Sequence, residues 1–582
     1  MQSETRQCQN CKQSFAIEPE DFNFYKKIGV PPPTFCPDCR TVRRISWRNE
    51  MSLFRRKCDA PGHDEDIISM YPPDEKLKTY DSSYWWSDNW DQLSYGRDYD
   101  FSKPFFQQWS ELYRDFPQQA LSNIHAVNSD YCNVAEDSRE SYMSSGSWKI
   151  ERTFYSNRIS ETKDCSDTYV THKSELCYED MFCEDCYRLM YSMKCKACVD
   201  SYFLYDCHGC TNCLGCTNQR NKSYCMWNEP LSKEEYTKRL SEIDLTSYAE
   251  ISKLKEKFDK LVLGAVNRFA NQIRSINSTG DNLDGVKNCH IIFDGNGNIE
   301  DCKFAHWVAH VVKDGYDIGP GLGDAELAYE AFDTGIGNYR NLFTSVVYSS
   351  NNVEYSFNCH GCSDLFGCIG IRNKKHCILN KEYSKEEYEA LVPKIKEHMM
   401  NMPYVDRNGL TYKYGEFFPA ELSPFCYNET QAQDYFPLTK EEALSRGYRW
   451  RDKKQNEYSL TIEAKDLPDR LGDVRDSILS EVIGCANRNN SGGRCRGAFK
   501  ITDGELKLYK KLGVPLPHLC FFCRHEARLA KRNPMKLWHR SCMCQKAVHS
   551  HAGKCLNEFD TAFAPDRPET VYCEDCYNKE VY

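Results

Sequence analysis

The sequence predicts a mixed α/β, multidomain protein in which zinc ribbons at both ends flank a cysteine-rich, β-solenoid-like repeat region with a helical insert. Three features of the chain predict this class. Paired cysteines near the N-terminus recur near the C-terminus, and cysteines in the middle of the chain recur with a short fixed period. The third feature is the length of 582 residues, which exceeds what one hydrophobic core accommodates.

The segment 1–58 is an N-terminal module whose cysteines stand in two CxxC pairs. These cysteines are Cys8, Cys11, Cys36 and Cys39. Two such pairs about 20 residues apart predict a zinc ribbon, in which four thiolates bind one zinc ion and leave no coordination position open. Zinc at this site would be structural. Disulfides or free thiols are the alternative, which the spacing disfavours.

A second copy of this module stands near the C-terminus, where Cys495–Cys542 matches Cys11–Cys58 without a gap. Gly492 takes the place of Cys8, and Cys485 is the best replacement ligand. The predicted second site is Cys485, Cys495, Cys520 and Cys523. The predicted third site is Cys542, Cys555, Cys573 and Cys576, with Cys544 as a spare or alternative ligand. The sequence therefore predicts at least three zinc ions.

The segment after the N-terminal ribbon matches the third site but has lost most of its ligands. Alignment of the two copies places a histidine, an aspartate and a tyrosine on three of the four cysteines, and these residues are His63, Asp81 and Tyr84. Cys58 remains, so Cys58, His63 and Asp81 could still bind zinc weakly. We expect instead that this degenerate ribbon folds on its aromatic residues without a metal.

Both ribbons are followed by basic runs with aromatic neighbours, a pattern typical of contacts to nucleic acid. The candidate arginines are Arg40, Arg43, Arg44, Arg48, Arg524, Arg528 and Arg532. The alternative is internal pairing, because the segment 59–100 is rich in acidic residues and contains few basic ones. We favour internal pairing, since the whole chain carries a net charge of −10.

Residues 120–230 and 280–382 consist of short units rich in tyrosine and cysteine, which are typical of stacked strands. The 12-residue period is clearest in Cys183, Cys186, Cys195, Cys198, Cys207 and Cys210. Stacked rungs lie about 4.8 Å apart, so this ladder could hold zinc, or it could be an inward row of small thiols. Both regions lead into the sequence Ser-Lys-Glu-Glu-Tyr, which predicts a capped helix.

These features divide the chain into six segments. They are 1–101, the N-terminal zinc ribbon plus the degenerate second ribbon; 102–229, the first β-repeat arm; 230–277, the helical insert; 278–402, the second arm with its closing helix; 403–466, an aromatic- and proline-rich connector; and 467–582, the C-terminal double zinc ribbon. In the insert, Ile251, Leu254 and Phe258 begin an apolar stripe at helical spacing that continues to Ile273.

Several motifs resemble those of a known group of proteins. The segments Cys36-Pro-Asp-Cys39-Arg40, Trp85-Trp86 and Tyr572-Cys-Glu-Asp-Cys576 resemble large cysteine-rich zinc-ribbon proteins predicted from the genomes of candidate-phylum bacteria. The resemblance covers nearly the whole chain and implies zinc and a bacterial cytoplasm, but no mechanism. The absence of an apolar signal core and of a membrane-length apolar run also indicates the cytoplasm and no membrane partner.

No nucleotide-binding loop, Rossmann fingerprint, HExxH motif or nucleophile elbow is found in the sequence. The sequence therefore favours a non-enzymatic, zinc-binding scaffold or interaction protein whose partner is an unidentified protein or nucleic acid. One alternative is a zinc-ribbon protein that binds RNA or single-stranded DNA. Another is a carbohydrate-active enzyme on the solenoid, which would need an aromatic cleft with two facing carboxylates.

Overall fold

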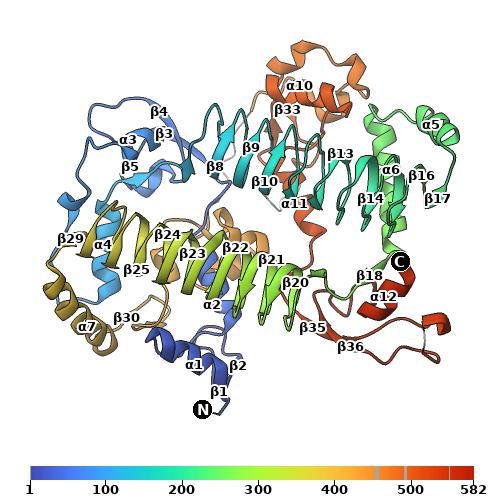
Figure 1. Ribbon diagram of the computed structural model, residues 1–582. Helices are drawn as coiled ribbons and strands as arrows, with labels where there is room; N and C mark the ends of the chain where they lie inside the picture. The colour runs from blue at the N-terminus through green and yellow to red at the C-terminus, as the bar shows by residue number, and fades with distance from the viewer. Residues whose placement is uncertain (1, 453–457, 490–493, 550) are drawn as a thin grey trace.

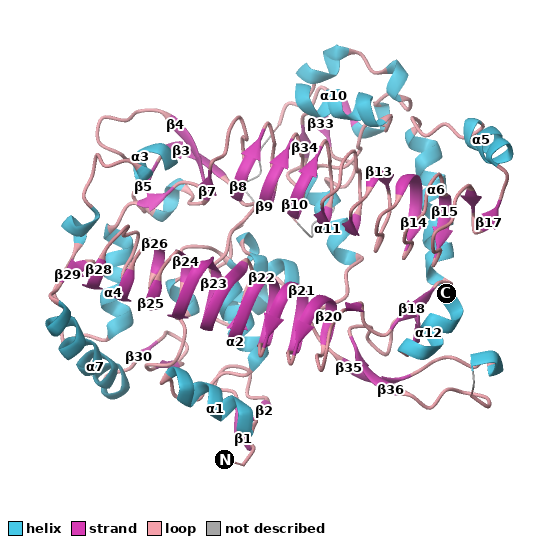
Figure 2. Cartoon of the chain, in the orientation of Figure 1, coloured by secondary structure: helices cyan, strands magenta, loops and turns pink. Residues whose placement is uncertain are grey.

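A computed structural model shows a β-solenoid of about 21 turns that is divided into two arms (Figure 1). The structure describes residues 2–452, 458–489, 494–549 and 551–582. We call residues 123–230 the first arm and residues 272–382 the second arm. The arms lie beside each other, with helices and small modules around them (Figure 2). The predicted solenoid is therefore confirmed.

The strands of the first arm are short, whereas the second arm also contains the longer strands β21, β22 and β23. Those of the first arm are β7 (Asn123–Ile124), β8 (Asn133–Arg139), β9 (Ser145–Glu151), β10 (Asn157–Lys163), β11 (Tyr169–His172), β12 (Met181–Glu184), β13 (Tyr187–Met190), β14 (Val199–Tyr205), β15 (Leu214–Thr217), β16 (Cys225–Met226) and β17 (Glu229–Pro230). Those of the second arm are β19 (Gln272–Ile273), β20 (Gly280–Lys287), β21 (His290–Glu300), β22 (Lys303–Ile318), β23 (Leu322–Leu342), β24 (Ser345–Tyr348), β25 (Asn351–Glu354), β26 (Phe357–His360), β27 (Ser363–Phe366), β28 (Lys375–Ile378) and β29 (Lys381–Glu382).

Parallel pairing between neighbouring strands fixes a 12-residue turn in the first arm, as in the pairing of Thr171 with Cys183. Parallel bridges from Met181 to Met193 and from Met193 to Tyr205 keep the same 12-residue offset, which confirms the predicted register of the ladder cysteines. A shorter period lies within each turn. Every third residue has a positive φ, for example 51° at Asp164 and 57° at Asp167. The residue after such a position is generally buried, so a turn consists of four three-residue units that each send one side chain inward.

The inward positions hold small side chains that also satisfy the backbone. The thiol of Cys183 donates to the carbonyl of Met181 at 3.3 Å, and the hydroxyl of Ser156 donates to that of Phe154 at 2.8 Å. Serine oxygens also accept from the next turn, as Ser174 does from the backbone N–H of Cys186 at 3.1 Å. Cysteine and serine thus have the same role here, since buried polar backbone groups need partners. This three-residue period produces the CxxC spacing of the ladder.

A substitution at one ladder position tests this description of the interior. The Cys198 thiol is buried and contacts the carbonyls of Lys196 and Cys207, at 3.5 and 3.2 Å. We expect Cys198→Ser to change the free energy of unfolding by less than about 1 kcal/mol, because the hydroxyl keeps these contacts. Cys198→Leu should cost about 1–3 kcal/mol by overpacking. Urea denaturation measures both values, and a serine variant as unstable as the leucine variant would contradict the prediction.

Helices close both arms, as the sequence predicted. Helix α5 (Lys233–Ser241) begins at Ser232, and α7 (Lys385–Asn401) begins at Ser384. Helix α6 (Tyr248–Leu263) buries Ile251, Leu254 and Phe258 against the first arm. The apolar stripe was predicted to run on to Ile273, but the helix ends at Leu263 and β18 (Val266–Arg268) follows.

The two modules predicted as zinc ribbons around Cys8–Cys39 and Cys485–Cys523, called the long ribbons below, pack on the arms in a crossed arrangement. The N-terminal ribbon contains β1 (Glu4–Gln7), β2 (Ser14–Ile17), α1 (Pro19–Ile28) and α2 (Pro37–Ile45), and the C-terminal one contains β33 (Ile483–Gly484), β34 (Ala498–Phe499), α10 (Asp503–Leu512) and α11 (Phe521–Ala530). Tyr25 of α1 contacts Tyr329 of the second arm, with ring centroids 5.6 Å apart. The equivalent Tyr509 of α10 contacts Tyr178 of the first arm at 5.8 Å. Each ribbon therefore docks on the arm that is distant from it in sequence.

The short module that follows each ribbon attaches next to the start of an arm. The first has β3 (Phe54–Lys57), β4 (Asp66–Ser69), β5 (Thr79–Tyr80) and α3 (Ser82–Trp86), and the second has β35 (Trp538–Ser541), β36 (Glu558–Thr561), β37 (Thr570–Tyr572) and α12 (Glu574–Val581). Strand β5 pairs with β6 (Gln118–Gln119), just before the first arm. Strand β37 pairs with β18, just before the second arm. The two end modules therefore attach in matching ways, each by a parallel strand pair just before an arm.

Most of the remaining elements pack on the second arm and the N-terminal ribbon. The remaining elements are α4 (Phe105–Asp115), β30 (Tyr404–Val405), β31 (Thr411–Tyr412), α8 (Gln431–Tyr435), α9 (Lys440–Ser445) and β32 (Ile462–Glu463). Trp109 of α4 is fully buried and contacts Phe418 of the connector, with ring centroids 4.4 Å apart. Phe105 contacts Tyr355 of the second arm at 5.2 Å. This aromatic core joins the N-terminal ribbon, the connector and the second arm.

Candidate metal centres

The structure brings the predicted ligands together in three groups of four cysteines. The groups are Cys8, Cys11, Cys36 and Cys39; Cys485, Cys495, Cys520 and Cys523; and Cys542, Cys555, Cys573 and Cys576. Within each group the sulfur atoms all lie within 4.8 Å of one another, so each group could hold a metal ion. All 33 cysteines are free thiols, so none of these groups is committed to a disulfide.

The third cysteine of each group stands at the beginning of a helix. Cys36, Cys520 and Cys573 are the N-cap residues of α2, α11 and α12. Their backbone N–H groups donate to the sulfur of Cys8, Cys485 and Cys542 respectively, in each case at 3.2 Å. Such bonds and the positive end of the helix dipole favour thiolate over thiol, which is the form that binds metal.

Cys485 occupies the position that Cys8 has in the first ribbon. The amide of Asn10 donates to Cys39 at 3.4 Å, and that of Asn487 donates to Cys523 at 3.6 Å. Hydrogen bonds from the neighbouring thiols, first Cys520 and then Cys523, lower the pKa of Cys485 to about 3. Because Cys485 and Asn487 match Cys8 and Asn10, the extra residues of the second ribbon come after Asn487 in the sequence. Gly492, which aligns with Cys8 in the ungapped register, lies outside the described residues.

The degenerate ribbon retains part of this geometry. Cys58, His63 and Glu65 form a group of three possible ligands. The backbone N–H of Asp81 donates to Cys58 at 3.2 Å, as Cys573 does to Cys542. Asp81, the weak third ligand that the alignment left open, is not in this group: its carboxylate accepts from the backbone N–H of Ser83 at 2.8 Å and caps α3. Glu65 lies beside His63 instead.

The ladder cysteines do not assemble into such groups. Within the described part of the chain, no cluster of three or more possible ligands includes Cys183, Cys186, Cys195, Cys198, Cys207 or Cys210. Their thiols donate to backbone carbonyls instead. Of the two interpretations left open by the sequence, the inward row of small thiols is the one that this geometry supports.

The arginines of α2 and its C-terminal end point into the second arm. Arg40 lies 2.8 Å from Asp317 and Arg43 lies 2.6 Å from Glu330, with all four side chains no more than 2% exposed. Arg44 is fully buried near both carboxylates, and Arg48 pairs with Glu50 and Asp333 at 2.6 and 3.3 Å. Buried, paired guanidinium groups offer little surface to phosphates, so this geometry favours internal pairing of these residues.

The equivalent arginines of α11 point into the first arm. Arg524 and Arg528 both bind one carboxylate oxygen of Asp167, at 2.9 and 2.6 Å, and all three side chains are buried. Arg532 is partly buried and stacks on Tyr435, 3.9 Å from the ring centroid. The expected internal pairing is present, but most of its acidic partners lie in the arms. Carboxylates of the acidic segment 59–100 pair with other basic side chains, such as Lys57.

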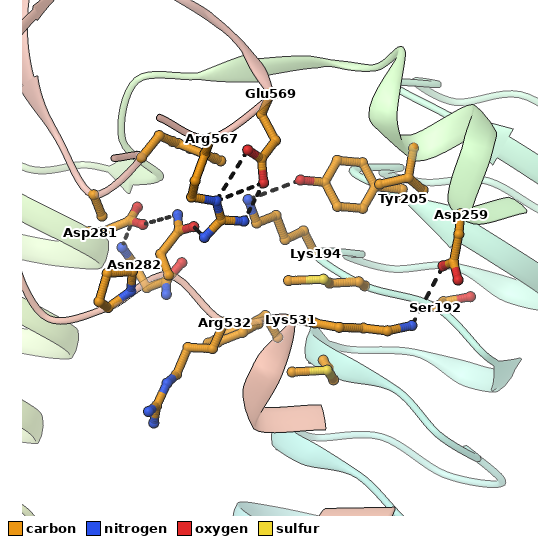
Figure 3. Close-up of a pocket in the computed structure, with 18 of the residues that line it drawn as sticks. Ser192, Lys194, Tyr205, Asp259, Asp281, Asn282, Lys531, Arg532, Arg567 and Glu569 are labelled. Carbon is orange, nitrogen blue, oxygen red and sulfur yellow. Dashed lines mark hydrogen bonds and ion pairs between the residues drawn. The ribbon is translucent and has the colours of Figure 1, made fainter. Parts of the chain in front are cut away.

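A cavity of about 360 Å³ lies between the two arms, beneath α6 and the C-terminal module (Figure 3). Aromatic side chains line it, including Phe182, Tyr205 and Phe258. Its carboxylates all have partners: Glu179 with Lys255, Asp259 with Lys531, Asp294 with Arg158, Glu569 with Arg567, and Asp281 with the backbone of Asn271. Burial raises the pKa of Asp281, against the effect of Lys194. The described lining therefore offers no pair of free facing carboxylates.

Comparison of the chain with models of known protein families and with curated proteins gives no match. Within the described residues, every helix is too short or too polar to cross a lipid bilayer.

Proposed function

We propose that this protein is a zinc-stabilised, non-enzymatic scaffold that binds a macromolecular partner. The observation that carries this proposal is the set of three four-cysteine groups, each near an end of the chain and each in a module that packs on a solenoid arm. Four thiolates favour zinc and leave no position for a substrate, as in structural zinc sites. Zinc ions in these three groups would stabilise the end modules and so fix the orientation of the two arms relative to each other.

The alternative functions receive less support. A nucleic-acid-binding protein would need accessible arginines, whereas those beside the ribbons are largely buried and paired. A carbohydrate-active enzyme would need an acid and a base that face each other, and the carboxylates of the cavity between the arms are held by other groups. A long solenoid with fixed arms instead presents an extended surface, which is typical of proteins that bind other macromolecules.

Metal analysis of the protein purified under reducing conditions tests the proposal. We expect at least three zinc ions per chain. Cys520→Ser should lower the content by one ion, because it removes a ligand of one group. Cys207→Ser is the matched control, since this cysteine is buried in the ladder and belongs to none of the ligand groups formed by the described residues, and it should leave the content unchanged. Iron in place of zinc, fewer than two ions, or a loss in the control would contradict the proposal.

A further inference from the structure

A second group of possible ligands lies against the third four-cysteine group. It consists of Cys544, His549, His551 and Cys576, whose ligand atoms all lie within 4.8 Å of one another. Cys576 belongs to both groups. The sulfur of Cys544 lies 3.1 Å from Nδ1 of His549, and that of Cys576 lies 3.5 Å from Nε2 of His551. Two ligands of one tetrahedral zinc ion are separated by about 3.5 Å, so these spacings suit a common ion.

In both histidines one ring nitrogen lies beside an oxygen acceptor, so the other nitrogen, which faces a cysteine, can bind a metal. Nδ1 of His551 lies 2.9 Å from the carbonyl of Gly553, which can only accept, so its proton is on Nδ1 and the lone pair of Nε2 faces Cys576. Nε2 of His549 lies 3.4 Å from the carboxylate of Glu580, which leaves Nδ1 to face Cys544. Metal-binding histidines commonly have their second nitrogen bound to a carboxylate or a carbonyl in this way.

The surroundings hold this loop in place. Lys579 donates to the backbone carbonyl of His549 at 2.9 Å, and Lys546 donates to Glu580 at 2.5 Å. His549 and the two cysteines are buried, whereas His551 is partly exposed. The two lysines also supply positive charge next to a cluster of thiolates, which lowers the electrostatic cost of bringing them together.

Comparison of the two copies shows that these ligands arise from an insertion. Cys542 matches Cys58, which places Cys544 on Ala60, whereas Cys555 matches His63. The stretch from Cys542 to Cys555 is therefore longer than the stretch from Cys58 to His63. Both histidines lie in that longer loop. The N-terminal copy therefore lacks the loop, the thiol of Cys544 and the thiol of Cys576 together.

We propose that the C-terminal module binds two metal ions that share the thiolate of Cys576. One ion would be held by Cys542, Cys555, Cys573 and Cys576, and the other by Cys544, His549, His551 and Cys576. The inference rests on the proposed function, because it assumes that the four-cysteine groups hold zinc. Seven ligands, one of them shared, give each ion four, so Cys544 is a ligand of the second ion and not a spare for the first.

The double variant His549→Ala/His551→Ala of the full chain tests the proposal by metal analysis. We expect it to hold one zinc ion fewer than the native protein, with the other ions retained. His539→Ala is the matched control, because this exposed histidine of β35 lies in the same module and belongs to no ligand group among the described residues. It should keep the native content. A double variant with the native zinc content would overturn the proposal.

X-ray absorption of the native protein gives a second test that does not depend on any variant. Two ions that share one sulfur, each about 2.3 Å from it, must lie less than about 4.6 Å apart. We expect a metal–metal distance below that limit and a first shell of sulfur with some nitrogen. A shell of sulfur alone without a metal–metal vector would overturn the shared site and leave the three four-cysteine sites standing. A native protein without zinc would overturn both proposals.

Discussion

Asp167→Ala should destabilise the protein by about 3–5 kcal/mol, one of the largest effects expected for a single substitution. The Asp167 carboxylate is fully buried, and one of its oxygens binds both Arg524 and Arg528. Burial alone would raise the pKa of Asp167, but the two guanidinium groups outweigh it and hold the pKa below its ordinary value. Removal of the carboxylate would leave two buried positive charges without a counterion.

The comparison with an exposed ion pair makes this prediction specific. Asp503 lies 2.6 Å from Lys507 on the surface of α10, and Asp503→Ala should cost less than about 1 kcal/mol. Thermal and urea unfolding measure both variants. In the triple variant Asp167→Leu/Arg524→Met/Arg528→Met, most of the lost stability should return, because replacement of all the buried charges is often nearly neutral. An Asp167→Ala variant as stable as Asp503→Ala would show that the ion pairs of Asp167 with Arg524 and Arg528 do not anchor the C-terminal ribbon.

Removal of metal by a chelator should unfold the end modules before the solenoid. Zinc binding by small peptides contributes about 10–16 kcal/mol, which is comparable to the stability of a whole domain. The ribbons bury many of their apolar side chains in cores that they share with the arms, so we expect bound zinc to supply much of the stability within each ribbon. The ladder of the first arm is held by backbone and inward hydrogen bonds, which need no metal.

Amide hydrogen exchange with and without chelator measures this order of events. We expect fast exchange in α1, α2, α10 and α11 after chelation, with β9–β15 still protected. Cys198→Ser is a useful control, because its ladder should behave like the native one in both conditions. Equal loss of protection in ribbons and ladder would mean that the metal holds the whole molecule, and no change in the ribbons would mean that their own packing suffices.

The sequence predicted much of the architecture because local spacing encodes it. The 12-residue period follows from the length of one solenoid turn, and it is visible in the cysteines of the first arm. A three-residue period was visible too, for example in Ser141, Ser144 and Ser147, and it would have identified the CxxC ladder as inward positions. The helices after Ser232 and Ser384 were predictable for the same reason, since a capping residue acts on its own neighbours.

Two features of the metal centres could not be predicted from such spacing. The alignment of Asp81 with a cysteine left it open as a weak ligand, but its carboxylate caps the helix that follows it. His549 and His551 lie in a loop that has no counterpart in the first copy, so alignment of the copies passed over them. Only the folded loop brings them to Cys544 and Cys576.

By itself, the sequence determined which cysteines gather in fours, because ligands of one knuckle are neighbours in the chain and their spacing fixes their geometry. It also determined that the basic runs needed counterions. Only the tertiary structure decided which carboxylates those are. The acidic segment near Arg40 in sequence was the expected partner, whereas the actual partner is Asp317, far along the chain in β22 of the second arm. The partner is set by the docking of a ribbon on a distant arm, and burial there makes the pairing obligatory.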